Sequence, residues 1–242
     1  MFSVIFPGQG SQIVGMGKEF YDRYDVVKKL FQEADDTLGI NLSKIILNGP
    51  KEQLDLTANT QPAIFLISYS IFQVIKNQFN INLNDTKYFA GHSLGEYSAL
   101  SCANYLDFNE TIKILRIRGN AMQNSVHQGE GGMLAVLGST IKDIEKILVE
   151  NEKNFKAFIA NDNTEGQLVI SGKINDLEKL SDILKNKKIK NIKLPVSAPF
   201  HCNLMIKAKE IMSHELQKIR FQKSNNILIS NVTANEIKNI DE

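Results

Sequence analysis

The hydrophobic and polar positions of the chain follow two rhythms, one of short strands and one of longer helices. Short β-like runs occupy 3–6, 87–90 and 227–230. Between them, apolar residues recur every three or four positions over 20–38 and again over 59–75, as on one face of an amphipathic helix. Strands that lie far apart and alternate with helices predict a mainly parallel sheet covered by helices.

Two helix starts carry capping signals. Thr60 stands two residues before Pro62, and proline is favoured in the first turn of a helix, so we expect Thr60 to cap the helix over 59–75. Asp107 and Glu110 have the spacing of a capping box, and an apolar helical stripe follows them.

The rhythm changes between positions 129 and 195. There the pattern predicts strand, helix, strand, strand, helix and strand, over 132–137, 141–150, 155–159, 167–171, 174–186 and 191–194. This β-α-β-β-α-β order is the ferredoxin-like one. We therefore expect a ferredoxin-like small domain over 128–196, inserted into a larger α/β domain formed by 1–127 and 197–242.

Composition narrows the class of protein. The 242 residues, 43% of them hydrophobic, suffice for a full core in one or two domains. Because 28 basic side chains balance 27 acidic ones, no field would attract nucleic acid or an anionic membrane surface. The apolar runs fall far short of the roughly 20 residues that cross a bilayer. The amino terminus lacks the basic region of a signal peptide, so we expect a cytoplasmic protein.

Cysteine usage excludes two kinds of site. Cys102 and Cys202 are the only cysteines, and neither belongs to a CxxC motif or a Cys/His cluster. A disulfide framework and a zinc site are therefore not indicated, and we expect no metal.

The strongest chemical signal is the pentapeptide that runs from Gly91 to Gly95 with Ser93 at its centre. It follows the strand over 87–90 and precedes a helical stretch, which is the setting of a GxSxG nucleophile elbow. The amino terminus of that helix would direct N–H groups at an oxyanion. The alternative is a glycine-rich connection in which Ser93 only caps the helix.

A serine nucleophile needs a base, and four histidines are available. His92 adjoins Ser93 and would project away from it, whereas His127 and His214 lie in polar surroundings typical of the surface. His201 lies in the segment that leaves the last strand of the small domain, and it follows the serine in chain order. We expect His201 to be the base, with a structural histidine as the alternative.

Two further features could complete a site. The loop over 7–12 follows the first strand, so its N–H groups could supply a second oxyanion donor, although a simple turn fits equally well. Arg118 has apolar neighbours four positions away on both sides, whereas we expect Arg116 to face solvent. Arg118 could hold a substrate carboxylate as a bidentate clamp, or merely form a surface ion pair.

These segments together resemble the malonyl-CoA:acyl carrier protein transacylase family. The resemblance rests on motifs in chain order, at 7–12, 91–100, 118–119, 131–133 and 200–201. It implies an α/β fold with an α/β-hydrolase-like large domain and the ferredoxin-like small domain.

The resemblance also implies a chemistry. Ser93 would take malonyl from coenzyme A and pass it to the phosphopantetheine thiol of acyl carrier protein, with His201 as base. Backbone N–H groups of Gln9 and Leu94 would form the oxyanion hole, and Arg118 would bind the malonyl carboxylate. Malonyl-CoA is a substrate here, so no cofactor is implied, and we expect a monomer.

The resembling family continues for several dozen residues beyond position 242, with a segment that orients the catalytic histidine. We therefore expect the chain to be a fragment of a longer gene product. The alternatives are a truncated, inactive carrier-binding homologue, a serine thioesterase or hydrolase, and the loading domain of a larger polyketide synthase.

Overall fold

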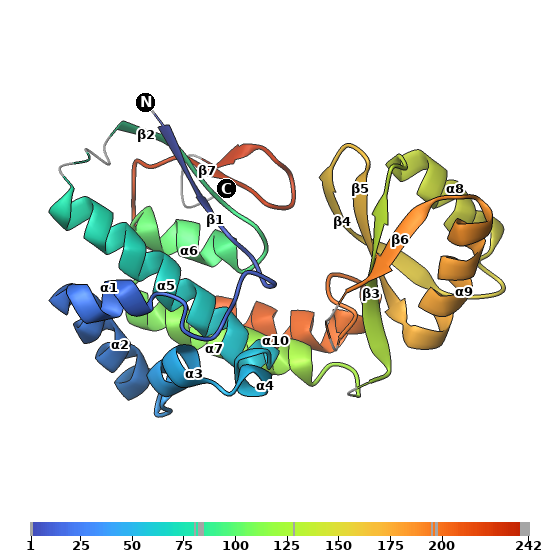
Figure 1. Ribbon diagram of the computed structural model, residues 1–242. Helices are drawn as coiled ribbons and strands as arrows, with labels where there is room; N and C mark the ends of the chain where they lie inside the picture. The colour runs from blue at the N-terminus through green and yellow to red at the C-terminus, as the bar shows by residue number, and fades with distance from the viewer. Residues whose placement is uncertain are drawn as a thin grey trace. The chain divides into compact units, whose positions relative to one another are not determined.

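The computed structural model describes residues 2–79, 81, 85–127, 129–194, 196 and 198–237 (Figure 1). The chain divides into two compact units. The first combines Met1–Asn120 with His214–Glu242, and the second is Ala121–Ser213. The predicted domain boundaries at 128 and 197 lie outside the described residues. The fold class is α/β, as predicted, with one sheet in each unit.

The sheet of the first unit is mixed. Its strands, in the order β1-β2-β7-β8, are β1 (Phe2–Phe6), β2 (Thr86–Gly91), β7 (Leu228–Ile229) and β8 (Glu236–Ile237). β1 and β7 both pair parallel with β2, and β8 is antiparallel to β7. The three predicted strands are confirmed. Their parallel pairing brings the carboxyl ends of β1, β2 and β7 to one edge of the sheet.

Helices cover this sheet in layers. The helices of the first unit are α1 (Lys18–Arg23), α2 (Asp25–Leu38), α3 (Leu42–Asn48), α4 (Lys51–Leu54), α5 (Thr57–Gln78), α6 (Gly95–Cys102) and the larger part of α7 (Phe108–Gln123), whereas α10 (Ile206–Leu216) lies mostly in the second unit. α6 packs against β1 and β2, α5 packs against α6, and α2 packs against α5. The division between the units falls within α7 and α10.

Two expected helices differ in detail. The helix predicted over 20–38 is broken at Tyr24, whose extended backbone separates α1 from α2. α5 begins at Thr57, so Thr60 is an interior residue and not its cap. The Thr60 hydroxyl instead donates a hydrogen bond to the carbonyl of Leu54 at 2.6 Å. The capping prediction for Asp107 holds, because its carboxylate accepts backbone N–H groups in the first turn of α7.

The second unit has the predicted order of elements. They are β3 (Gly131–Leu137), α8 (Ile141–Glu150), β4 (Ala157–Thr164), β5 (Gln167–Lys173), α9 (Ile174–Asn186), β6 (Lys190–Lys193) and the short 3-10 helix η2 (Asn203–Met205). The sheet order is β4-β5-β3-β6, and neighbouring strands are antiparallel. β4 begins two residues later than predicted, after the core residue Phe155, and runs on to Thr164, five residues beyond the predicted end.

Among the described residues, no helix combines the length and apolar character that spanning a membrane requires.

Candidate active site

The turn between β2 and α6 has the backbone of a nucleophile elbow. β2 ends at Gly91, α6 begins at Gly95, and Ser93 between them has a φ of 53°. This left-handed conformation is uncommon for a residue other than glycine and is stored strain of the kind found at functional sites. A Cβ on Gly91 would collide with the backbone of Gly95 and Glu96. Glycine at position 91 therefore permits the tight reversal.

The loop after β1 packs directly against this turn. The His92 N–H donates to the carbonyl of Phe6 at 3.1 Å. A Cβ on Gly95 would lie 2.5 Å from the same carbonyl oxygen, and one on Gly8 would lie 2.5 Å from His92 Nδ1. The segment that carries Gln9 thus lies beside Ser93, as the parallel pairing of β1 and β2 requires.

The backbone N–H groups of the site differ in what they bind. The Ser93 N–H donates to Asn231 Oδ1 at 2.8 Å. The N–H groups of Leu94 and Gln9 donate to no acceptor in the part of the chain that the structure describes. The Gln9 side chain is held separately, by a hydrogen bond to Thr57 Oγ1 at 3.2 Å. The N–H groups of Gln9 and Leu94 can therefore donate hydrogen bonds to a ligand.

Arg118 reaches the serine from α7. Its Nη2 donates to Ser93 Oγ at 3.1 Å and its Nη1 to Gln61 Oε1 at 2.7 Å. The guanidinium also lies over the ring of Tyr97, 5.7 Å from its centroid. Burial lowers the pKa of Arg118, and the interactions with Tyr97 and Glu96 oppose that change. A guanidinium keeps its proton far above neutral pH, so the side chain remains cationic there.

Arg116 does not face solvent, contrary to expectation. It is half-buried, and its Nη1 donates to the carbonyl of Ala58 at 2.8 Å and to Asn59 Oδ1. Pro62 has no N–H for the Ala58 carbonyl four residues before it, so the guanidinium satisfies an acceptor that the helix leaves open. This second arginine therefore supports the start of α5.

Two polar residues of the site were missed in the sequence. Gln61 is 1% exposed and orients Arg118, and Asn231 binds the Ser93 backbone. The Asn231 N–H in turn donates to Glu96 Oε1 at 3.1 Å, and burial raises the pKa of Glu96. A signal for Asn231 was available, since it directly follows a predicted parallel strand at the edge where the serine turn lies.

His201 lies in the second unit on a strained backbone. Its φ is 57°, and its side chain is exposed. Its neighbour Phe200 is buried in the core of the unit, and the Phe200 carbonyl accepts a hydrogen bond from Ser171 Oγ at 2.5 Å. Cys202 Sγ contacts the carbonyl of Pro199 at 3.1 Å. The residues on both sides thus hold His201 in its left-handed conformation.

The other histidines have no comparable setting. His92, His127 and His214 are exposed like His201, but none of these three has the left-handed backbone of His201. The structure therefore gathers Ser93, Leu94, Gln9 and Arg118 in one site of the first unit, and His201 belongs to the second unit.

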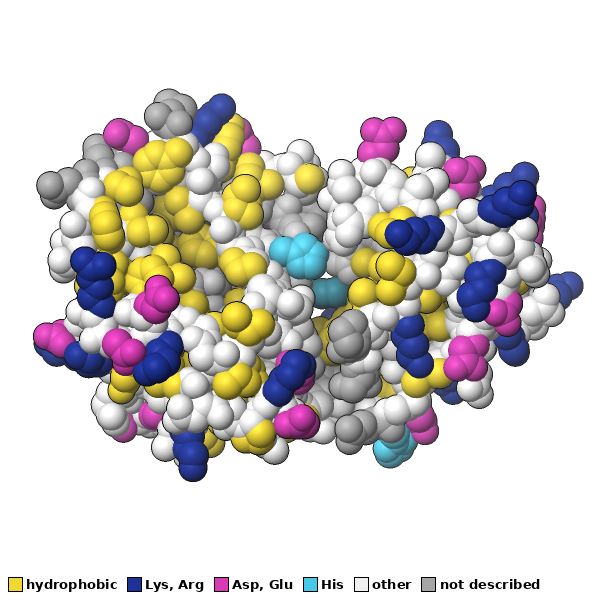
Figure 2. Space-filling view, viewed as in Figure 1, with side chains coloured by type: hydrophobic (Ala, Val, Ile, Leu, Met, Phe, Trp, Pro, Cys, Tyr) yellow, Lys and Arg dark blue, Asp and Glu magenta, His cyan; other side chains and the backbone are white. Residues whose placement is uncertain are grey.

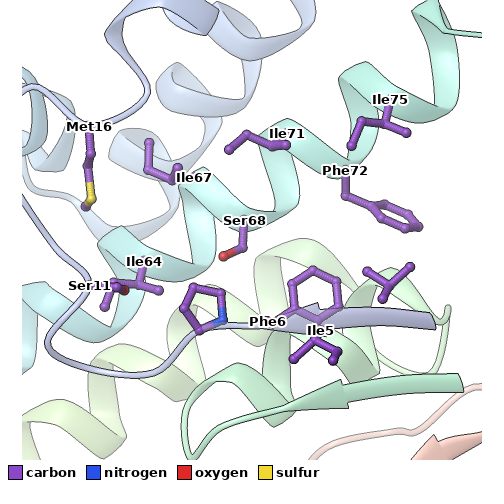
Figure 3. Close-up of a pocket in the computed structure, with 12 residues that line it drawn as sticks. Ile5, Phe6, Ser11, Met16, Ile64, Ile67, Ser68, Ile71, Phe72 and Ile75 are labelled. Atoms are coloured by element: carbon purple, nitrogen blue, oxygen red, sulfur yellow. The ribbon is translucent and has the colours of Figure 1, made fainter. Parts of the chain in front are cut away.

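An apolar cavity of about 350 Å³ lies elsewhere in the first unit, between β1 and α5 (Figure 3). Hydrophobic side chains gather on this face (Figure 2). The polar side chains of its lining are the hydroxyls of Ser11 and Ser68, so the cavity offers no cation to an acidic ligand. Within the described residues, no group of three or more His, Cys, Asp or Glu could hold a metal ion.

Comparison with known proteins places this geometry in a family. The family model for the acyl transferase domain matches residues 3–242. The chain belongs to the acyl transferase family. Family membership agrees with a strained serine in a GxSxG turn, with two unoccupied N–H groups and a cation beside it.

Two relatives in this family have the same name. The malonyl CoA-acyl carrier protein transacylase of Bacillus subtilis (strain 168) is 41% identical over 233 residues, which cover 95% of this chain and 72% of that protein. The protein of the same name from Haemophilus influenzae is 38% identical over 241 residues, covering 99% of this chain and 74% of the relative. The predicted resemblance to malonyl-CoA:acyl carrier protein transacylases is confirmed.

Solved structures of the acyl transferase family have the same fold as this chain. The acyl-carrier-protein-S-malonyltransferase from Bartonella henselae superposes with a TM-score of 0.93 at 41% identity, over 98% of this chain and 76% of that one. A malonyl-transacylase solved in complex with a type II PKS acyl-carrier protein gives a TM-score of 0.92 at 35% identity, over 98% and 76% of the two chains.

Proposed function

We infer that this chain transfers a malonyl group from coenzyme A to the phosphopantetheine thiol of acyl carrier protein, through a malonyl ester of Ser93. Membership of the acyl transferase family and relatives named for this reaction support the assignment. The observation that carries it is the hydrogen bond from Arg118 to Ser93 Oγ, because it puts a cation beside the nucleophile. An acyl group that ends in a carboxylate has a partner there.

The first half-reaction acylates the serine. His201 accepts the proton of the Ser93 hydroxyl while Oγ attacks the thioester carbonyl of malonyl-CoA. The N–H groups of Gln9 and Leu94 stabilise the negative oxygen of the tetrahedral intermediate. The C–S bond then breaks, and the thiol of coenzyme A leaves with the proton from His201.

The second half-reaction reverses these steps with another thiol. The phosphopantetheine thiol of the carrier gives its proton to His201 and attacks the malonyl ester. Ser93 leaves with that proton, and malonyl remains on the carrier as a thioester. Coenzyme A and the carrier act as donor and acceptor substrates, so the chemistry calls for no cofactor.

Arg118 provides selectivity for malonyl. In malonyl-Ser93 one methylene separates the free carboxylate from the ester carbon, so that carboxylate lies within reach of a guanidinium that touches Oγ. Gln61 binds the Nη1 arm of the guanidinium, and the ring of Tyr97 lies against one of its faces. The Nη2 arm, beside Ser93 Oγ, is the one that would bind the substrate carboxylate. An acetyl group would leave this half-buried cation without an anion, at a cost of about 1–3 kcal/mol.

The assignment of His201 as base rests on its backbone. A left-handed φ at a residue other than glycine persists only where the surroundings enforce it, and here the buried Phe200 and the Ser171 hydrogen bond do so. The His201 side chain is exposed, as a base that meets two thiol substrates must be.

The finer fold assignment is part of the proposal. The strand-turn-helix setting of Ser93, on a sheet whose first three strands are parallel, supports an α/β-hydrolase-like domain over 1–127 and 197–242. The order β4-β5-β3-β6 with two helices supports a ferredoxin-like domain over 128–196. The monomeric state and the cytoplasmic location stay predictions.

Intact-protein mass spectrometry tests the function. Brief mixing with malonyl-CoA should add one malonyl group to the chain and none to Ser93→Ala. Adding carrier protein with its phosphopantetheine should then move the adduct to the carrier. Loss of the adduct to free malonate at the same rate without the carrier would indicate a thioesterase, and a persistent adduct on Ser93→Ala would remove Ser93 from the mechanism.

A further inference from the structure

Asn231 binds the nucleophile from the neighbouring strand. β7 pairs parallel with β2 in a register that sets Ala90 opposite Ile229. Continuing both chains by two or three residues past this pair reaches Ser93 on one side and Asn231 on the other. The Ser93 N–H donates to Asn231 Oδ1 at 2.8 Å across a separation of 138 residues. Because a backbone N–H can only donate, the amide oxygen of Asn231 faces the turn.

Asn231 is itself held on both sides. Its N–H donates to Glu96 Oε1 at 3.1 Å, and Glu96 is the second residue of the helix that follows the serine turn. Before it, Ser230 Oγ accepts the N–H groups of Val232 and Thr233 at 3.3 and 3.2 Å and shapes the loop. The Glu96 N–H donates back to the Ser93 carbonyl at 3.1 Å, so the contacts form a closed circuit of Ser93, Asn231 and Glu96.

This circuit has a consequence for the oxyanion hole. The left-handed φ of Ser93 presents its N–H to Asn231, which removes that N–H from the groups able to bind a substrate oxygen. The next N–H along the chain, that of Leu94, has no acceptor among the described residues. The Ser93 N–H thus holds the turn, whereas the Leu94 N–H can donate to the substrate oxygen.

We propose that Asn231 is a positioning residue for the acyl transfer, whose side-chain oxygen holds the Ser93 N–H and thereby directs Oγ and the Leu94 N–H at the substrate carbonyl. The inference rests on the proposed function for the reaction it serves. It goes beyond that function by naming a residue outside the nucleophile, base, oxyanion and carboxylate assignments. Glu96 supports Asn231 through the Asn231 backbone, so its part is indirect.

Three variants separate positioning from general stability. Asn231→Leu has a similar size and lacks the acceptor, whereas Asn231→Asp keeps an oxygen at the same reach. Val232→Asp adds the same negative charge at the next residue, whose side chain is 92% exposed. It controls for the effect of the added charge alone. Thermal unfolding of each variant identifies any general loss of fold.

Two reagents report on Ser93. Malonyl-CoA in single-turnover experiments gives the maximal acylation rate and the half-saturating concentration by intact mass. A fluorophosphonate, which carries neither malonyl nor coenzyme A, forms an Oγ–P bond, releases fluoride and gives the serine proton to the base. It measures the nucleophile without the substrate site.

The expected result is a loss of rate without a loss of binding. Asn231→Leu should slow both reactions on the order of 10- to 100-fold and leave the half-saturating concentration of malonyl-CoA within about twofold of the parent. Asn231→Asp and Val232→Asp should stay within about threefold of the parent rate.

Either of two results would overturn the inference: parent rates for Asn231→Leu with both reagents, or a folded Asn231→Asp as slow as Asn231→Leu. A parent chain that reacts with the fluorophosphonate and not with malonyl-CoA would instead refute the malonyl assignment. In that case the fluorophosphonate rates still decide the role of Asn231.

Discussion

The guanidinium of Arg118 donates a hydrogen bond to the hydroxyl of Ser93 at 3.1 Å, although the two residues lie on different elements and 25 positions apart. The contact joins Ser93, which is proposed to form the acyl ester, with Arg118, which is proposed to select malonyl over acetyl. Gln61 holds the second arm of the guanidinium at 2.7 Å, so the cation keeps its position without a carboxylate partner. The arrangement leads to predictions on selectivity, strain, packing and pH dependence.

Replacing Arg118 should change selectivity more than fold. Arg118→Ala should lower malonyl transfer on the order of 10- to 100-fold more than acetyl transfer, because only malonyl loses a charge-assisted partner. Arg118→Lys should not restore the ratio, since an ammonium cannot reach Gln61 and a carboxylate with one planar fork. The two rates are compared by carrier-protein acylation with malonyl-CoA and acetyl-CoA.

Arg116→Ala is the matched control for that prediction. It removes the donor to the Ala58 carbonyl ahead of Pro62, so the free energy of unfolding should fall by about 1–3 kcal/mol. The ratio of malonyl to acetyl transfer should not change. Equal losses of both substrates in Arg118→Ala would contradict the carboxylate clamp.

The strain at Ser93 can be measured with two variants that both lack the hydroxyl. Ser93→Gly relieves the left-handed φ of 53°, whereas Ser93→Ala retains a Cβ in that conformation. We expect the glycine variant to be about 1 kcal/mol more stable than the alanine variant, by urea denaturation, and both to lose acylation. An alanine variant at least as stable as the glycine variant would show that the turn is not strained.

Close contact of strand and helix should make Gly91 intolerant of any side chain. In Gly91→Ala the new Cβ meets the backbone of Gly95 and Glu96, which no rotamer change can relieve. We expect a loss of more than about 3 kcal/mol in the free energy of unfolding, or no folded protein. Gly132→Ala is the control, because its Cβ would have ordinary contacts at 3.6 and 3.7 Å. Similar losses in both variants would contradict the packing argument.

The half-buried carboxyl of Glu96 should make the stability of the fold depend on pH. Burial raises its pKa, so the folded chain binds this proton more tightly than the unfolded chain does. Unfolding free energy should therefore decline as pH rises from the unfolded pKa to the folded one. Glu96→Gln keeps an oxygen for the Asn231 N–H and does not titrate, so it should be more stable than the parent at neutral pH and lose that advantage in acid.

Urea denaturation of parent and Glu96→Gln from about pH 4 to about pH 7 checks this prediction. Glu52→Gln serves as the control, because Glu52 is an exposed carboxylate on α4. A constant difference between parent and Glu96→Gln over the whole range would show that the Glu96 carboxyl does not couple to folding.

The local features of the site could be predicted from the sequence. Gly91, Ser93 and Gly95 lie within five residues, and the strand before them and the helix after them follow from hydrophobic periodicity. The order of elements in the second unit followed in the same way. Such features depend on backbone preferences and on the alternation of buried and exposed positions. A few neighbouring residues in the sequence are enough to determine both.

Long-range partners could not be predicted in this way. Asn231 reaches Ser93 because β7 pairs with β2 in one register, and Arg116 turns inward to bind the Ala58 carbonyl, 58 positions away in the chain. Thr60 was mistaken for a cap because the tertiary packing of α5 extends that helix back to Thr57. The sequence by itself determined the serine turn and the elements around it. Tertiary structure decided which distant polar groups meet there, since strand register and burial depend on the whole chain.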